Sequence, residues 1–348
     1  MKAMIFEQTG EPADVLHIRD VPDPEPGPGD ILVRVLLSPV HPADLHVMRG
    51  RFGRTPALPT SPSIECVGVV EALRAGVDGP KPGTRVVLLD IWASWRELVV
   101  APAERVIPVP DAVSDQDAAQ AMINPLTALV LTLVEHRLRP GEWLAQTAAG
   151  STVGRLVLQL ARREGFRTLN LVRRSAQVAE IAELGGDLTL CTDDGDWPAQ
   201  FARTAESGRL EKAIDCVGGR VGAAVARGLQ PGGRLLVYGA LSSHRQSDPA
   251  AFEMPIFVPR LIYSATSVQG WFLFHWLNLT PIVETSAALR SVLDRLVAGQ
   301  LRLPPAKVYR PGEVSTALAQ AEASDCDGKP LIDMTCVRGR LSLSGKSG

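Results

Sequence analysis

A turn of small residues separates an expected strand at residues 143–147 from an expected helix at residues 153–164. The turn reads Ala148-Ala149-Gly150-Ser151-Thr152-Val153-Gly154. Small residues at such a turn let the backbone approach a pyrophosphate, whose charge is favoured by the free N–H groups and the dipole at the helix start. Only Gly154 matches the full glycine pattern of dinucleotide sites, so a plain small-residue turn remains the alternative.

The residues after the second strand of this block indicate which dinucleotide would bind. The strand expected at residues 168–172 is followed by Arg173, Arg174 and Ser175. An NAD site places Asp or Glu here to accept the ribose hydroxyl groups. Guanidinium groups instead pair with phosphate oxygens in a fork geometry, so the sequence predicts NADPH. The alternative is a solvated basic start of the next helix.

A set of residues that could bind a metal lies in the first third of the chain. Zinc alcohol dehydrogenases hold their catalytic metal with a Cys, a His-Glu pair and a third ligand. Here His41 stands at the first place and the pair reads Ile64-Glu65, with His46 as another nearby candidate. We therefore predict no metal site. Without a Lewis acid to polarise an alcohol oxygen, hydride delivery to an activated C=C bond becomes the better expectation.

The elements around these residues predict two domains. Residues 1–110 show short β segments broken by Pro and Gly, which predicts a compact β-barrel-like domain. After helical stretches at residues 115–122 and 125–135, strand and helix signals alternate, which predicts a parallel sheet covered on both faces. Its strands are expected at residues 143–147, 168–172, 188–191, 212–217, 234–238 and 262–268, with helices at 153–164, 176–184, 197–206 and 221–229.

The bulk properties of the chain exclude several classes of protein. At 348 residues, the chain is long enough for two domains. Its net charge of -2 gives no reason to expect nucleic acid or an acidic membrane as a partner. It contains no apolar run of about 18 residues, and residues 1–6 read as a strand rather than a signal or transit peptide, which predicts a cytoplasmic protein. Five dispersed cysteines form no CxxC pair and predict buried apolar side chains.

Further motifs follow one another in a recognisable order. They are His41-Pro42-Ala43-Asp44, Asn124-Pro125-Leu126-Thr127-Ala128, Tyr238-Gly239-Ala240-Leu241, Gly270-Trp271-Phe272-Leu273 and Lys329, in addition to the turn ending at Gly154 and the arginine pair. Over about residues 1–335, this order resembles the zinc-independent medium-chain reductases. The resemblance is strongest to the mitochondrial-type trans-2-enoyl thioester reductases, with quinone oxidoreductases more distant.

The resemblance implies an α/β fold. A GroES-like β-barrel catalytic domain (residues 1–125 and 265–348) would carry an inserted Rossmann domain (residues 126–264), a doubly wound parallel sheet that binds NADPH, with the substrate cleft at their junction. It also implies a homodimer formed through the edge strand near residues 262–268. The cofactor residues it implies are Asn124, Thr127, Gly150, Ser151, Thr152, Val153, Gly154, Arg173, Arg174, Ser175, Tyr238, Gly239, Ala240, Leu241, Trp271, Phe272, Leu273 and Lys329.

One departure from the family concerns its catalytic tyrosine, which is thought to help protonate the α-carbon. The corresponding stretch here reads Gly50-Arg51-Phe52-Gly53, so the ring is kept and the acid is lost. His41 replaces a family Asn, and an imidazole can act as an acid near neutral pH, so His41 is a candidate proton donor. Asp44 and Thr127 are further polar candidates, for which a structural role is favoured over a catalytic one. A purely structural, hydrogen-bonded role for His41 remains the alternative.

The sequence therefore predicts an NADPH-dependent reductase that delivers hydride to the β-carbon of an α,β-unsaturated carbonyl compound. A 2-enoyl thioester or an activated enone is the expected substrate, and a quinone is the alternative. An alternative from another class is an NADPH-binding sensor or partner module with little catalysis. The aromatic residues after the sixth strand are expected to form a substrate or nicotinamide wall, although ordinary core packing is also open; they are Trp271, Phe272, Phe274, His275 and Trp276.

Overall fold

The computed structural model describes residues 1–51, 56–208, 210–243, 246, 248–323 and 328–337. The chain divides into two compact units. Unit 1 comprises Met1–Ile123, Pro281–Val297 and Leu303–Gly348, and unit 2 comprises Asn124–Thr280 and Ala298–Arg302. Within the described ranges, every helix is too short or too polar to cross a membrane.

Unit 1 is built mainly of antiparallel strands. A seven-stranded sheet has the order β14-β15-β3-β4-β5-β7, with β6 paired to β3, and β1 and β2 form a separate pair. The strands are β1 (Lys2–Phe6), β2 (Leu16–Asp20), β3 (Asp30–Pro39), β4 (Val67–Leu73), β5 (Arg85–Leu88), β6 (Leu98–Pro102), β7 (Val106–Pro108), β14 (Ala306–Tyr309) and β15 (Lys329–Asp333).

The core of unit 1 follows from the two-residue period of these strands. In β3, Ile31, Val33 and Val35 are buried while Arg34 points to solvent, as expected for a sheet with one covered face. Phe6 and Trp95 are fully buried in the same cluster. The helices of this unit are α1 (Pro12–Val15), α2 (Pro42–Met48), α3 (Asp115–Ala118), α11 (Ile282–Val297) and α12 (Val314–Glu322).

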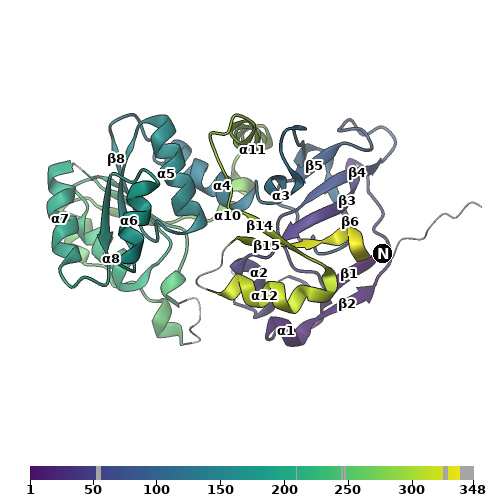
Figure 1. Cartoon of the computed structure of the whole chain (residues 1–348), viewed down its shortest axis with the longest axis horizontal. Helices are drawn as coiled ribbons and strands as arrows, with labels where there is room; N and C mark the ends of the chain where they lie inside the picture. Colours follow the sequence, from purple (N-terminus) through teal and green to yellow (C-terminus); the bar gives the residue numbers. More distant parts are fainter. Residues whose placement is uncertain (52–55, 209, 244–245, 247, 324–327, 338–348) are drawn as a thin grey trace, which may run out of the picture. The chain divides into compact units, whose positions relative to one another are not determined.

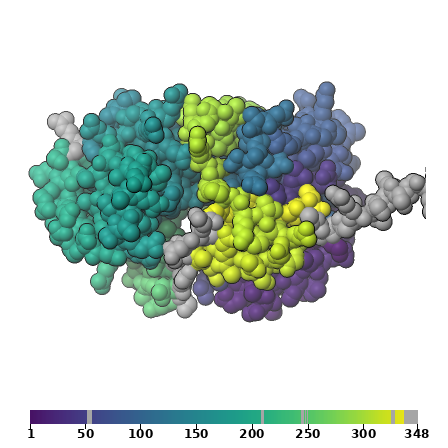
Figure 2. Space-filling view, viewed as in Figure 1, coloured from purple at the N-terminus to yellow at the C-terminus, as the bar shows by residue number. Residues whose placement is uncertain are grey.

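The C-terminal strand β15 lies inside the sheet made by the N-terminal part of the chain. It pairs antiparallel with β3, where Leu331 is opposite Pro39, and parallel with β14. The backbone N–H of Val40 also donates to the carbonyl of Pro330 at 2.9 Å. Figure 2 shows these late residues in yellow packed in the same unit as the early ones in purple. This pairing brings Lys329 to His41.

Unit 2 contains a six-stranded parallel sheet of order β10-β9-β8-β11-β12-β13. In chain order this is 3-2-1-4-5-6, so the direction of winding reverses between β8 and β11, which confirms the predicted doubly wound sheet. Helices α5 to α8 pack beside the strands (Figure 1). The strands are β8 (Trp143–Gln146), β9 (Arg167–Val172), β10 (Leu188–Cys191), β11 (Lys212–Asp215), β12 (Arg234–Val237) and β13 (Ser267–Gly270).

Seven α-helices of the described chain begin at or after residue 123 and lie before residue 280. They are α4 (Ile123–Leu129), which continues into a π-helical turn (Val130–Glu135), α5 (Thr152–Glu164), α6 (Ala176–Glu183), α7 (Trp197–Gly208), α8 (Gly219–Gly228), α9 (Val258–Tyr263) and α10 (Leu273–Leu279). The buried face of α5 carries Val153, Leu156, Val157 and Leu160, the spacing that a 3.6-residue period requires.

Two predicted elements were wrong. The strand expected at residues 262–268 begins only at Ser267, because Pro259 occupies the first turn of α9, where its fixed φ favours a helix over a strand. The helix expected at residues 115–122 ends at Ala118. After it, the backbone N–H groups of Gln120 and Ala121 donate to carbonyls three residues earlier, and that of Met122 donates to the Glu65 side chain.

Candidate active site

Three charged or titratable side chains form a connected chain in unit 1. His41 Nε2 lies 2.6 Å from Oε2 of Glu65, and His41 Nδ1 lies 3.0 Å from Nζ of Lys329. His41 and Glu65 are buried, with 4% and 2% of their surface exposed, while Lys329 is half-buried. An ammonium group only donates, so Nδ1 accepts from Lys329 and the imidazole proton sits on Nε2, directed at the Glu65 carboxylate.

The carboxylate of Glu65 is fixed from both sides. Its Oε1 accepts from the backbone N–H groups of Met122 at 2.6 Å and Ile123 at 2.8 Å, while Oε2 faces His41. The carbonyl of Glu65 accepts from the hydroxyl groups of Ser38 at 2.6 Å and Ser94 at 3.1 Å. With both ends held in this way, Glu65 presents one oxygen to the imidazole in a fixed direction.

Asp44 lies one helical turn from His41 and is fully buried. His41 is the residue before α2, and its backbone N–H donates to Oδ2 of Asp44 at 2.7 Å, as in one half of a capping box. The other carboxyl oxygen, Oδ1, has no hydrogen-bond partner among the described residues. Burial raises the pKa of Asp44 to about 7, although the His41 N–H and the Lys329 ammonium act against this.

The same surroundings keep the imidazole neutral. Burial lowers the pKa of His41, and the nearby Lys329 ammonium lowers it further, whereas Glu65 acts in the opposite direction. The structure therefore brings together three of the residues singled out in the sequence, His41, Asp44 and Lys329. It adds Glu65 as their partner; the sequence suggested Glu65 only as a possible metal ligand. Phe52, at the position of the family tyrosine, lies outside the described residues.

The predicted cofactor segments of unit 2 gather at one edge of the sheet. The small-residue turn follows β8, Arg173 begins the loop after β9, Tyr238 follows β12 and Trp271 follows β13. Because all six strands are parallel, these four segments lie at their common carboxyl edge. Ligands of doubly wound sheets bind at this edge, next to the reversal in strand order.

The turn after β8 has the geometry that its small residues suggest. Ser151 precedes α5, and its hydroxyl accepts from the N–H of Gly154 at 3.2 Å. A Cβ atom on Gly154 would lie 2.5 Å from the carbonyl oxygen of Ala149, so only glycine fits here. The N–H groups of Thr152 and Val153, in the first turn of α5, need partners from outside the helix. The turn thus suits a phosphate group.

The arginine pair is exposed at the end of β9, and no carboxylate occupies residues 173–175. Both guanidinium groups therefore project from the loop that follows the second strand, where dinucleotide selection is made. Asn124 and Thr127 lie one turn apart on α4, and Thr127 is buried. Ser175 precedes α6 without making a side-chain cap.

The segments after β12 and β13 combine buried polar groups with exposed apolar side chains such as Leu241 and Phe272. Burial raises the pKa of Tyr238 well above its usual value, and the neighbouring Cys216 thiol adds to the shift. The indole N–H of Trp271 is buried and has no hydrogen-bond partner among the described residues, as expected where a ligand supplies the acceptor. Leu273 is buried, and the Phe272 ring lies 5.4 Å from that of Phe274. Gly239, Ala240 and Leu241 follow Tyr238 in the same loop.

A buried carboxylate at this edge was missed in the sequence. Asp215 ends β11, and its Oδ1 accepts from the Thr147 hydroxyl at 2.6 Å and the Val217 N–H at 2.9 Å. Its Oδ2 accepts from the N–H of Gly218 at 3.0 Å. The carboxylate thereby ties the ends of β8 and β11 together at the reversal in strand order. The sequence feature that could have indicated this carboxylate is a single Asp at the end of an apolar strand.

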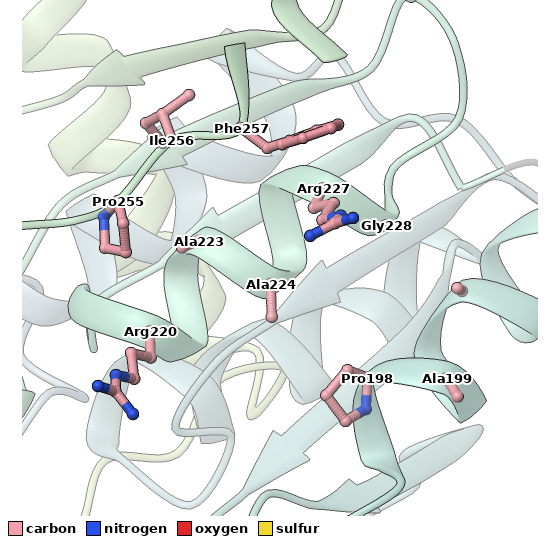
Figure 3. A pocket seen from close by; sticks show the side chains of 11 residues that line it. Pro198, Ala199, Arg220, Ala223, Ala224, Arg227, Gly228, Pro255, Ile256 and Phe257 are labelled. Carbon is pink, nitrogen blue, oxygen red and sulfur yellow. The ribbon is translucent and has the colours of Figure 1, made fainter. Parts of the chain in front are cut away.

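A surface groove of about 710 Å³ lies between α7 and α8 (Figure 3). Its lining includes small side chains such as Ala223 and Ala224, and the Arg227 guanidinium lies 4.3 Å from the centre of the Phe257 ring. None of the residues predicted for the site lines this groove. Among the described residues, no group of three His, Cys, Asp or Glu side chains is placed to hold a metal ion.

Two protein-family models match the chain, one within unit 1 and one largely within unit 2. Residues 27–111 match the alcohol dehydrogenase GroES-like domain, and residues 152–288 match the zinc-binding dehydrogenase domain. The chain belongs to the medium-chain dehydrogenase/reductase superfamily. The predicted combination of a GroES-like domain with a Rossmann-like domain is therefore confirmed. Members of this superfamily use NAD(P)H as their cofactor.

Two groups of proteins within this superfamily are similar to the chain along most of its length. A mitochondrial enoyl-[acyl-carrier-protein] reductase of Bos taurus is 28% identical over 309 residues, covering 87% of this chain and 81% of that protein. A proposed NADPH:quinone reductase of Bacillus thuringiensis has a TM-score of 0.85 at 27% identity, covering 95% of this chain and 98% of the other. The chain is thus homologous to both groups.

Structures of Etr1p share the fold at lower identity. Its complex with NADP and crotonyl-CoA has a TM-score of 0.79 at 22% identity, and the Etr1p/Etr2p heterodimer from Candida tropicalis has one of 0.77 at 22%. In both cases the match covers 95% of this chain and 99% of the other.

Proposed function

We propose that this medium-chain reductase is an NADPH-dependent enzyme that reduces the C=C bond of an α,β-unsaturated carbonyl compound, with a 2-enoyl thioester or an activated enone as substrate. A bound NADPH would supply the hydride, which forms a new C–H bond at the β-carbon. The observation that carries the cofactor choice is the exposed pair Arg173 and Arg174, in a loop without a carboxylate. Their fork-shaped guanidinium groups suit a 2′-phosphate.

The substrate class is supported by the relatives. An enoyl reductase aligns with 87% of this chain, and the Etr1p complex holds crotonyl-CoA, an enoyl thioester. The chain's own residues would bind the diphosphate at the turn around Gly154 and orient the substrate carbonyl towards hydrogen-bond donors. Such fixed donors stabilise the negative charge that develops on the carbonyl oxygen. Quinone reduction is the second candidate, because the Bacillus thuringiensis protein of similar structure is a proposed quinone reductase.

A substrate panel tests this proposal. NADPH oxidation is followed by the loss of reduced-nicotinamide absorbance with 2-enoyl thioesters of several chain lengths, simple enones and quinones, and NADH is run in parallel. Turnover of enoyl thioesters or enones with a preference for NADPH is the expected result. Turnover of quinones alone would favour the second candidate. Tight NADPH binding without reduction of any compound would contradict both and favour an NADPH-binding sensor.

We also propose that two copies of the chain form a homodimer through unit 2. Strand β13 is the last strand of its sheet within the described residues, so its outer backbone groups are open for pairing. Helix α9, close before β13 in the sequence, exposes large apolar side chains, with Ile262 64% and Tyr263 84% exposed. Exposed apolar patches of this kind mark association sites. The heterodimer of Etr1p and Etr2p supports assembly of related chains.

A further inference from the structure

The acid that completes the proposed reaction has to come from outside position 52. Adding hydride to the β-carbon leaves an enolate, whose α-carbon must gain a proton. Phe52 has no ionisable proton to give. Four ionisable side chains meet in the buried cluster of unit 1, namely His41, Asp44, Glu65 and Lys329.

The hydrogen bonds of the cluster indicate which of these four groups can donate a proton. Glu65 accepts from two backbone N–H groups and faces the imidazole, which is the pattern of an ionised carboxylate without a proton to donate. The Nε2 proton of His41 is directed at Glu65, and its Nδ1 accepts from Lys329. Asp44 is fully buried and accepts from the backbone N–H of His41. Lys329, half-buried at the start of β15, supplies the positive charge of the cluster.

We propose that Lys329 is the general acid that protonates the α-carbon of the substrate, and that Glu65 and His41 are positioning residues that aim its ammonium group. This inference rests on the proposed reduction of an α,β-unsaturated carbonyl compound. The hydride would leave a C–H bond of bound NADPH, which becomes NADP⁺, and form a C–H bond at the β-carbon, while the π electrons of the C=C bond move to the carbonyl to give an enolate. The enolate electrons then form a bond from the α-carbon to a proton of Lys329 as the C=O bond is restored. The N–H bond of Lys329 breaks, which leaves a neutral amine that takes up a proton again from water.

A lysine suits this task for two reasons. The ordinary pKa values of a lysine ammonium group and a tyrosine phenol are close, about 10.4 and about 10, so an ammonium can replace the missing phenol as an acid of similar strength. The backbone around Lys329 is also fixed, because its N–H donates to the carbonyl of Pro305 at 2.8 Å and the carbonyl of Pro330 accepts from Val40. One N–H of the ammonium is directed at His41 Nδ1, which orients the group.

The configuration of the newly protonated carbon tests this role. The substrate that the wild type reduces is turned over in deuterated water, and the configuration at the α-carbon is determined by NMR. The wild type should place deuterium on one face only. Lys329→Arg keeps a cation that can bond to His41 and to phosphate, but a guanidinium does not release a proton. Lys329→Arg and Lys329→Met should therefore both lose facial selectivity and slow about 10²- to 10⁴-fold.

A matched control is available on the neighbouring strand. Lys307 lies on β14, opposite Pro330, and its ammonium lies 5.1 Å from the Tyr309 ring. Lys307→Met should keep both rate and selectivity. If Lys329→Arg keeps the wild-type selectivity and rate, Lys329 is not the acid and the inference fails. If the wild type reduces no α,β-unsaturated carbonyl compound, the proposed function itself fails, which is a different result.

A measurement without turnover tests the positioning part. The chain has six histidines, so ¹⁵N-histidine labelling gives few signals, and His41→Asn identifies the one from His41. We expect an unprotonated Nδ1 and a protonated Nε2 in the wild type. In Lys329→Met the signal of Nδ1 should shift strongly, because it loses its donor. A protonated Nδ1 in the wild type would contradict the orientation of Lys329 by His41.

Discussion

His41 Nε2 lies 2.6 Å from Oε2 of Glu65, and both side chains are buried. In this arrangement the carboxylate decides which ring nitrogen carries the proton, because it accepts from Nε2 and leaves Nδ1 as an acceptor. Lys329 then meets a lone pair rather than an N–H group. Glu65 thus controls, through His41, the direction of the Lys329 ammonium group, which strand β15 brings to this place.

Glu65→Gln should reverse this arrangement. The amide oxygen can still accept from Met122 and Ile123, and keeping these two bonds turns the NH₂ group towards His41. Nε2 must then accept, so Nδ1 carries the proton and faces the ammonium of Lys329, donor against donor. We expect kcat to fall about 10²-fold, as for a misplaced catalytic group, with little change in Tm. Histidine ¹⁵N shifts should report the reversed tautomer, and an unchanged tautomer would refute this account.

Asp44→Asn should remove part of the pH dependence of stability. The folded-state pKa of Asp44 is about 7, well above that of an unfolded Asp, so the folded protein holds a proton that the unfolded chain releases. Stability is therefore lost as the pH rises from about 4 to about 7, by up to about 1.4 kcal/mol per pH unit. The variant imitates the protonated form, so its advantage in Tm over the wild type should grow from pH 5 to pH 8.

The exposed Asp14 of α1 provides the control for this comparison. Asp14→Asn should follow the wild-type dependence of Tm on pH. If Asp44→Asn also follows it throughout, the buried carboxyl group of Asp44 stays ionised in the folded protein and the expected proton uptake is absent.

Replacing Arg173 and Arg174 by Ala should weaken NADPH binding more than NADH binding. A charge-assisted hydrogen bond contributes about 1.5–3 kcal/mol, so we expect the Kd for NADPH to rise roughly 10- to 100-fold, with a small change for NADH. Calorimetric titration with both nucleotides measures this. Arg203→Ala, on the exposed face of α7, is the control and should change neither value. An equal loss of affinity for both nucleotides would show that Arg173 and Arg174 do not bind the 2′-phosphate.

Ile262→Lys should dissociate the proposed homodimer. A lysine at this exposed position of α9 would put a charge into the apolar contact between two copies. Light scattering coupled to size-exclusion chromatography should give the mass of a dimer for the wild type and of a monomer for the variant. Val283→Lys changes an equally exposed valine of unit 1 and should leave the dimer intact. A monomeric wild type would refute the proposal directly.

The parallel sheet and its cofactor segments were predictable from the sequence because their signals are local. The strand at residues 188–191 matches β10, and the turn of small residues does join β8 to α5. Helix periods, apolar strands and the turn residues between them are properties of short stretches of chain. The same local signals misplaced the last strand of the sheet, because an apolar, β-branched stretch near Ile262 resembles a strand while Pro259 starts a helix.

The cluster around His41 was decided by tertiary structure. Lys329 and His41 are 288 residues apart in the chain, and they meet only because β15 pairs with β3 in a particular register. Glu65 likewise reaches the backbone of Met122, 57 residues away. The sequence by itself determined which residue types are present and which short elements they form. Which nitrogen of His41 meets a carboxylate and which meets an ammonium depends on long-range strand pairing, whose register no local period specifies.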